Sequence, residues 1–304
     1  MLAAESRHIY ERGSTQRRLS WHFAFHSMTP DEYCQQKAAQ SGSSFYYSFL
    51  FLPPPRRRAI TALYAFCREV DDVVDECTDV AIARTKLAWW RTEVAAIYDG
   101  KASHPVGNAL ASVVTSFRLP QERLQEIIDG MEMDLTQHRY RDFDALKRYC
   151  HLVAGVVGLL SAEIFGYTDA RTLQYAENLG IAFQLTNIIR DVGEDARRER
   201  IYLPLDELAR FKVPVADILQ ARPSAEFRQL MDFQADRALD YYRAAFAALP
   251  ATDRKAQRPG LVMAAIYQTV LEEIHVDGMQ VLTQRTALTP LRKLWIAWRT
   301  WVRN

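Results

Sequence analysis

Apolar residues in this chain recur at intervals of three and four over long stretches, and strictly alternating patterns are nearly absent. The first spacing places side chains on one face of an α-helix, whereas alternation would indicate a β-strand. Prolines and glycines separate the periodic stretches, as at residues 53–55, Pro120 and Gly166. We therefore predict an all-α protein with helices over residues 30–40, 55–77, 80–99, 105–117, 120–138, 142–166, 170–193, 224–248 and 258–284.

The chain has no internal repeat, low-complexity tract or flexible linker between residues 28 and 289, which we predict to form one domain. Residues 1–27 carry Arg and His without helical periodicity, and they lack the apolar core of a signal peptide. Thr29 as N-cap and Pro30 at the first helical position mark the start of a helix directly after Met28. We expect residues 1–27 to be a disordered or non-native leader, with an amphipathic targeting segment as the alternative.

The last segment, residues 290–304, is basic, carries three tryptophans and has no acidic residue. Such amphipathic segments lie on anionic bilayer surfaces, and packing against the protein core is the alternative. No uninterrupted apolar run approaches the roughly 20 residues that a membrane span needs. We expect a cytoplasmic protein that does not cross the bilayer, with the inner face of the membrane as a candidate peripheral location.

Composition narrows the function classes. A 304-residue chain with 49% hydrophobic residues can bury a large core. The net charge is +1, and no basic stripe is interleaved with aromatic residues, so nucleic acid is not an expected partner. The four cysteines show neither metal-ligand spacing nor a disulfide framework, which favours a reducing compartment.

Two acidic helical clusters are the most informative feature of the sequence. Asp71 and Asp75 in the first, and Asn187, Asp191 and Asp195 in the second, are spaced by four residues and share a helix face. One such cluster alone also fits a solvated surface helix. Like charges at this spacing cost a few tenths of a kcal/mol, and aspartate is a poor residue for a helix interior. Because the acidic cluster occurs twice in spite of these costs, we favour two helices whose side-chain oxygens bind magnesium and, through it, a diphosphate.

Candidate anion ligands accompany both clusters. Arg68 lies one turn before Asp71, and Arg190 directly precedes Asp191, so each helix brings a guanidinium that suits phosphate oxygens. Either arginine could instead serve as a salt-bridge partner. Gln184 extends the polar face of the second helix, or is simply solvated. The polar segment at residues 41–44, where a helix starts, could also contact a diphosphate, or could serve only as an N-cap. The basic loop at residues 197–204 could do the same, or could be a solvated run of charges.

Three tyrosines, Tyr64, Tyr149 and Tyr267, lie on otherwise apolar helical stretches. A tyrosine in that setting commonly satisfies its hydroxyl within the core. The ring faces could also stabilise a carbocation, since the ring quadrupole attracts cations.

Residues 64–75, 149–158 and 184–195, in this order, resemble the signatures of the squalene/phytoene synthase family. The resemblance extends from about residue 30 to residue 285. Residues 41–54 are similar to the bacterial presqualene diphosphate synthase branch of that family, which serves hopanoid pathways.

The resemblance implies a class I terpenoid (isoprenoid) synthase fold, a helical bundle around a central cavity. It implies head-to-head condensation of two farnesyl diphosphates to presqualene diphosphate, with Mg²⁺ held by Asp71, Asp75, Asn187, Asp191 and Asp195. The implied catalytic residues are Asp71, Asp75, Asp191, Asp195, Arg68 and Tyr64. The residues implied to contact substrate are Ser41, Ser43, Ser44, Phe45, Tyr64, Arg68, Tyr149, Gln184, Arg190 and Tyr267.

Alternatives remain within the resemblance. A phytoene synthase would use two geranylgeranyl diphosphates, and a complete squalene synthase would reduce its intermediate. NADPH is not an expected cofactor, and enzymes later in a hopanoid pathway are candidate partners. A non-catalytic scaffold of the same fold is disfavoured, because both acidic clusters are intact.

Overall fold

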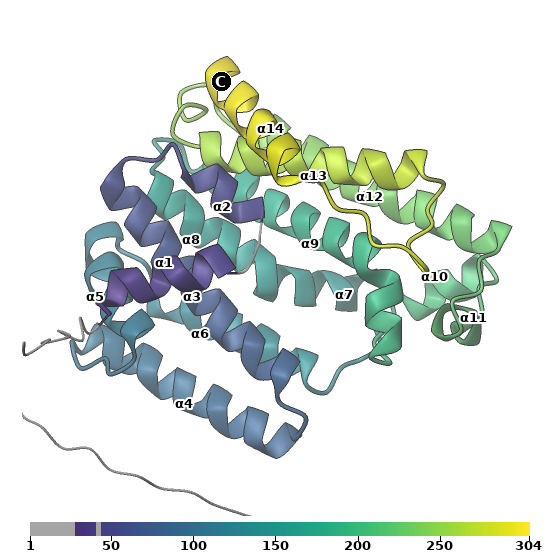
Figure 1. Cartoon of the computed structure of the whole chain (residues 1–304), viewed down its shortest axis with the longest axis horizontal. Coiled ribbons are helices and arrows are strands. Elements are labelled where there is room, and N and C mark those ends of the chain that lie inside the picture. Colours follow the sequence, from purple (N-terminus) through teal and green to yellow (C-terminus); the bar gives the residue numbers. More distant parts are fainter. Residues whose placement is uncertain (1–27, 41–43) are drawn as a thin grey trace, which may run out of the picture.

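The computed structural model describes residues 28–40 and 44–304, so the expectation for residues 1–27 lies outside the described part of the chain. The described residues form α-helices and one π-helical turn, with a single isolated bridge between Arg139 and Ile201 and no strand (Figure 1), which confirms the all-α prediction. The helices are α1 (Pro30–Gln40), α2 (Ser44–Phe49), α3 (Pro54–Glu76), α4 (Val80–Tyr98), α5 (Pro105–Phe117), α6 (Gln121–Asp134), α7 (Phe143–Cys150), the π-turn η1 (His151–Gly155), α8 (Val156–Phe165), α9 (Arg171–Arg197), α10 (Leu205–Arg210), α11 (Val215–Leu219), α12 (Ala225–Ala248), α13 (Arg258–Val276) and α14 (Pro290–Arg303).

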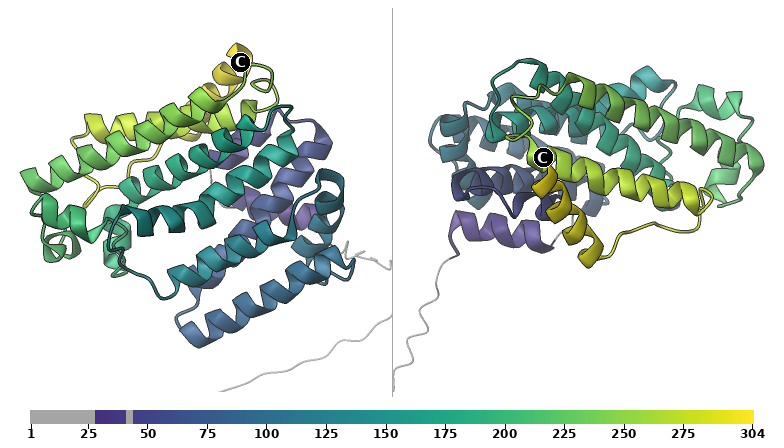
Figure 2. Two further views of the ribbon diagram at one scale, coloured as in Figure 1. Left: turned by 180° about the vertical axis from the view of Figure 1, so that it is seen from behind. Right: turned by 90° about the horizontal axis from the view of Figure 1, so that it is seen from above.

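The long helix α9 lies at the centre, with α8, α12 and α13 packed around it (Figures 1 and 2). Glycines allow the backbones of α8, η1 and α9 to touch. A Cβ on Gly158 would lie 2.2 Å from the carbonyl oxygen of Ala176, and one on Gly180 would lie 2.3 Å from that of Ala154. Any larger residue at either position would push the two helices apart.

The buried apolar residues form two clusters. One surrounds α9, α12 and α13, and the other joins α3 to α4, α5, α6 and α8. Phe45, Val153 and Trp301 pack against both clusters. Elements from both sides of this junction therefore surround the space between α3 and α9, where the two acidic helices face the same cavity.

Several helix ends differ from the prediction. Helix α6 ends at Asp134 rather than 138, and α9 continues to Arg197 rather than ending at 193. The predicted helix over residues 142–166 exists, but the π-turn η1 interrupts it. Helix α13 ends at Val276 rather than 284, because Gly278 adopts a positive φ of 76°.

The residues after α13 lie against α9. The backbone N–H of Gly193 donates to the carbonyl of Val281 at 3.1 Å. A Cβ at Gly193 would lie 2.3 Å from the carbonyl oxygen of Leu282, so a glycine is needed for this contact. The segment then continues toward α14 and brings Arg285 to the second acidic cluster.

One stretch, Phe143–Phe165, is long and apolar enough to cross a membrane by length and composition. The sequence expectation rested on uninterrupted apolar runs and did not identify it. In the structure, this stretch packs against α6 and α9, and Tyr149, Val153 and Phe165 line the cavity described next.

Candidate active site

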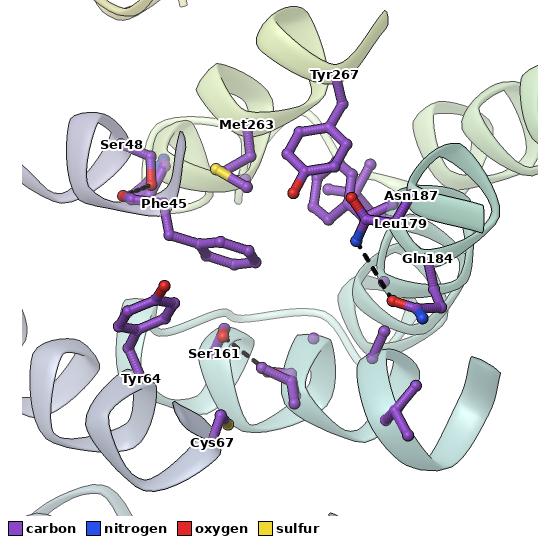
Figure 3. A pocket seen from close by; sticks show the side chains of 18 of the residues that line it. Phe45, Ser48, Tyr64, Cys67, Ser161, Leu179, Gln184, Asn187, Met263 and Tyr267 are labelled. Atoms are coloured by element: carbon purple, nitrogen blue, oxygen red, sulfur yellow. Dashed lines mark hydrogen bonds between the residues drawn. The ribbon is translucent and has the colours of Figure 1, made fainter. Parts of the chain in front are cut away.

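A cavity of about 450 Å³ lies between α2, α3, α8, α9 and α13. Its walls are mostly apolar and aromatic, and Figure 3 shows the Phe45 ring pointing into it between Tyr64 and Met263. The centroid of the Phe45 ring lies 5.5 Å from that of Tyr64 and 6.5 Å from that of Phe183. Phe183 in turn packs 4.9 Å from Tyr267. The cavity is therefore an apolar chamber with π-faces, open to the acidic clusters at one end.

Helix α3 brings the first cluster to this end. Its buried Val70, Val73 and Val74 anchor one face in the core, which leaves Asp71 half-buried on the face that lines the cavity. Burial raises the pKa of Asp71 to about 6, although the adjacent Arg68 opposes the shift. Arg68 also lines the cavity and donates to Asp71 at 2.6 Å.

Helix α9 brings the second cluster. Asn187 lines the cavity, and Asp191 lies one turn further along the helix. Arg190 Nε and Arg285 Nε donate to the same oxygen of Asp191, at 2.7 and 2.8 Å. Burial would raise the pKa of Asp191, but these hydrogen bonds and charges hold it below its ordinary value. Burial, with Asp191 as a like-charged neighbour, raises the pKa of Asp195 to about 7.

Cations also converge on the head of the cavity. Arg68, Arg190, Arg285 and Lys293 all line it. The pKa of Lys293 lies below its ordinary value, because the amine is partly buried and faces the charges of Arg190 and Arg285. Four cationic side chains at one cavity, one of them a lysine whose pKa the neighbouring arginines lower, form a favourable site for a multivalent anion such as diphosphate.

A buried network lies behind the two clusters, and sequence reasoning missed its central residue. The carboxylate of Asp134, at the end of α6, accepts from Tyr202 at 2.6 Å and from Arg200 at 3.1 Å. Arg200 and Arg198 also reach Asp75, at 3.4 and 3.2 Å. The predicted basic loop thus contacts the first acidic cluster. No Asp, Glu, Lys or Arg lies three or four positions from Asp134 to mark it as part of a site. Its link to the site, through Arg200 and Tyr202, is visible only in the folded chain.

The donor set of the two clusters suits a divalent cation with diphosphate. Its candidate ligands are all oxygens, and the side-chain oxygen of Asn187 is buried without a hydrogen-bond partner. Each of Asp71, Asp75 and Asp191 pairs with arginine, and no group of three or more His, Cys, Asp or Glu within the described residues converges on one point. The orphaned oxygen of Asn187 and the carboxylate of Asp71, both on the cavity wall, are features that a bound cation would satisfy.

The structure brings most of the predicted site residues together. Phe45, Tyr64, Arg68, Asp71, Tyr149, Gln184, Asn187, Arg190 and Tyr267 line the cavity. Asp75, Asp191 and Asp195 lie on the same two helices but do not line the cavity. Ser41 and Ser43 lie outside the described residues, and Ser44 is described only as the first residue of α2. Arg285 and Lys293 line the cavity but were not predicted.

An apolar chamber headed by paired acidic helices and arginines defines an all-α enzyme of prenyl diphosphate chemistry. The comparisons then identify the family. The chain belongs to the squalene/phytoene synthase family, whose model matches residues 38–292. This agrees with the resemblance drawn from the three sequence motifs.

Two curated relatives are named for the same product. The phytoene synthase of Arthrospira platensis is 36% identical over 86% of this chain and 89% of its own length. The 15-cis-phytoene synthase of Synechocystis sp. is 35% identical over 90% of this chain and 84% of its own.

Two solved structures share the fold. A dehydrosqualene synthase in complex with ligand superposes with a TM-score of 0.79 at 26% identity, covering 90% of this chain and 96% of its own. The squalene synthase HpnC from Alicyclobacillus acidocaldarius has a TM-score of 0.74 at 27% identity, covering 82% of this chain and 94% of its own.

Proposed function

We propose that this enzyme condenses two farnesyl diphosphates head to head, giving presqualene diphosphate and releasing one diphosphate. The observation that carries the proposal is the apolar cavity with acid- and amide-bearing helices and four cationic side chains at its head. In this reaction, the C–O bond of one substrate breaks, the double bond of the other attacks the cation, and proton loss closes a cyclopropane.

The residues proposed to hold Mg²⁺ are Asp71, Asp75, Asn187, Asp191 and Asp195. Bound magnesium would act as a Lewis acid on the departing diphosphate. Arg190, Arg285 and Lys293 would hold the phosphate oxygens, and Arg68 would approach them from α3. This role requires the arginines to exchange at least part of their present carboxylate partners for phosphate.

The cavity walls would protect the cation. Ionisation of an allylic diphosphate leaves a carbocation that water would quench, so the reacting carbons have to lie in a dry chamber. Phe45, Tyr64 and Tyr267 present aromatic rings around the cavity, and ring faces attract cations. No reductant is required for this product, so NADPH is not part of the proposal.

The length of the substrate distinguishes the proposed reaction, which uses farnesyl diphosphate, from the second candidate, which uses geranylgeranyl diphosphate. The solved relatives above 25% identity are named for squalene and dehydrosqualene, which supports farnesyl diphosphate. The curated relatives are named for phytoene, which supports geranylgeranyl diphosphate as the second candidate. The cavity extends along α9 from Asn187 to Tyr175, about 18 Å of helix, and Phe165 and Gln257 lie near its other end.

Product analysis tests the proposal. Purified enzyme with Mg²⁺ is given labelled farnesyl or geranylgeranyl diphosphate, with and without NADPH, and products are identified by mass. Presqualene diphosphate from the C15 substrate, unaltered by NADPH, is the expected result. Squalene on adding NADPH would make the enzyme a complete squalene synthase, and prephytoene diphosphate or phytoene from the C20 substrate alone would establish the second candidate. No product from either substrate would contradict both.

A further inference from the structure

Helix α14 carries a continuous apolar stripe on its outer face. Leu291, Leu294, Trp295, Trp298 and Val302 are 80%, 41%, 53%, 56% and 64% exposed. Their spacing of 0, 3, 4, 7 and 11 residues places all five on one side of the helix. Five large apolar side chains exposed side by side form a patch, and such patches mark interaction surfaces.

The opposite face of α14 is already packed, so the stripe is not a core face that failed to dock. Ile296 and Ala297 are buried. The ring of Trp301 packs against that of Phe51 in a tilted arrangement, with 5.3 Å between centroids, and the guanidinium of Arg258 lies 5.6 Å from the Trp301 ring centroid. The helix packs on α13 and α2, as seen at the C-terminal end of the chain in Figures 1 and 2. The body of the protein thus fixes the helix with its stripe facing outward.

The charge on α14 indicates what the stripe meets. Arg299 and Arg303 lie along one edge of the stripe together with Arg292, which pairs with Glu273 of α13 at 2.6 Å, and α14 itself has no acidic residue. The guanidinium of Arg299 lies 5.0 Å from the centroid of the Trp295 ring. Tryptophan and leucine on one side with arginines at the border match the acyl boundary and the anionic headgroups of a bilayer.

We propose that α14 docks the enzyme flat on an anionic phospholipid bilayer, with the stripe of Leu291, Leu294, Trp295, Trp298 and Val302 in the acyl boundary. The same helix forms part of the cavity wall, since Lys293 on its inner side lines the cavity together with Leu288 just before it. Docking would therefore place the cavity beside the membrane surface. The proposal concerns binding and does not depend on which reaction the cavity supports.

Vesicle sedimentation of the full chain tests the proposal. Binding is measured on vesicles of phosphatidylcholine alone and of phosphatidylcholine with phosphatidylglycerol. The double variant Leu291→Ser/Trp298→Ser removes two stripe residues seven positions apart. Ile82→Ser/Trp89→Ser is the matched control, because these residues have the same spacing on α4 and are 52% and 45% exposed.

Wild type and the α4 control should bind phosphatidylglycerol vesicles equally. The α14 variant should lose at least about tenfold in partitioning, the effect of leaving two large apolar side chains out of the bilayer. The variant Arg299→Gln/Arg303→Gln should also lose about tenfold or more, and only on the anionic vesicles. Circular dichroism confirms that each variant is folded.

Equal binding by wild type and the α14 variant, or no binding by wild type, would overturn the proposal. Sedimentation velocity without lipid identifies one competing occupant. If wild type forms dimers that Leu291→Ser/Trp298→Ser converts to monomers, while neither binds vesicles, the stripe is an interface between two copies of the chain.

Discussion

Asp134 is predicted to support both the stability of the fold and the geometry of the site. Its side chain is buried and accepts hydrogen bonds from Tyr202 and Arg200. Arg200 also reaches Asp75, one of the proposed metal ligands. The substitution Asp134→Asn keeps the shape of the side chain but removes the charge that both partners face.

The expected loss of stability follows from this network. Breaking a buried ion pair from one side costs about 3–5 kcal/mol, because the remaining charge is left without compensation. In the Asp134→Asn variant, Arg200 still has Asp75 as an ion-pair partner at 3.4 Å. We therefore expect the lower end of that range, about 3 kcal/mol. For a chain of this length, the melting temperature should fall by about 5 °C.

Activity separates a role in the site from a role in stability alone. Glu207→Gln is a matched control, because Glu207 is also buried and pairs with an arginine, Arg237, at 3.0 Å, away from the cavity. Thermal unfolding gives the stability of both variants, and turnover is measured per folded molecule well below the melting temperature. We expect Asp134→Asn to lose at least about tenfold in turnover and Glu207→Gln to keep wild-type turnover. Equal turnover of the two variants, or unchanged stability of Asp134→Asn, would refute the reasoning.

Three further predictions follow from the cavity and the core. Asn187→Leu removes the unpartnered buried oxygen. Turnover should fall about a hundredfold, and the Mg²⁺ concentration that gives the half-maximal rate should rise. An unchanged Mg²⁺ concentration at half-maximal rate would exclude Asn187 as a ligand. Phe165→Ala removes a ring from the cavity wall and so enlarges the cavity. When C15 and C20 substrates compete, the fraction of product made from the C20 substrate should therefore rise. An unaltered fraction would show that other residues select the chain length. Asp253→Ala removes a carboxylate that accepts from Thr168, Asp169 and Thr172 at the start of α9, and should cost about 3 kcal/mol of unfolding free energy in denaturant titrations.

The Asp253 prediction has a pH dependence of defined sign. Burial alone would raise the pKa of Asp253, but the hydrogen bonds from Thr168, Thr172 and the backbone lower it to about 2. A carboxylate whose pKa is lower in the folded state stabilises the fold above its unfolded pKa of about 4. The stability difference between wild type and Asp253→Ala should therefore be full above pH 4 and shrink as the pH falls toward 2. A difference that grows on acidification would contradict this account.

The sequence was sufficient to predict the elements that carry the site. The periodic spacing of Val70, Val73 and Val74 predicts one buried face on α3, and the aspartates on another face follow from the same periodicity. Helix α9 is predicted in the same way. Local spacing thus places the ligands of each cluster along one helix without any knowledge of tertiary structure.

Contacts between distant segments could not be predicted in this way. Asp134, at the end of α6, reaches the site only through Arg200, and Arg285 reaches it because the chain turns at Gly278 and follows α9. Their residue types are common, and no local spacing distinguishes them from surface charges. The outward stripe of α14 was predicted as an amphipathic tail, but its second, packed face became visible only in the fold.

The central claim is that the acids of α3 and α9 act together on one diphosphate through a divalent cation. Isothermal titration of the enzyme with inorganic diphosphate, with and without Mg²⁺, tests this claim most directly. Wild type and the surface control Asp240→Asn should bind diphosphate tightly only when Mg²⁺ is present. Asp71→Asn and Asp191→Asn should each weaken that binding by at least about tenfold, about 1.4 kcal/mol. Binding that is independent of Mg²⁺, or unchanged in either variant, would contradict the account.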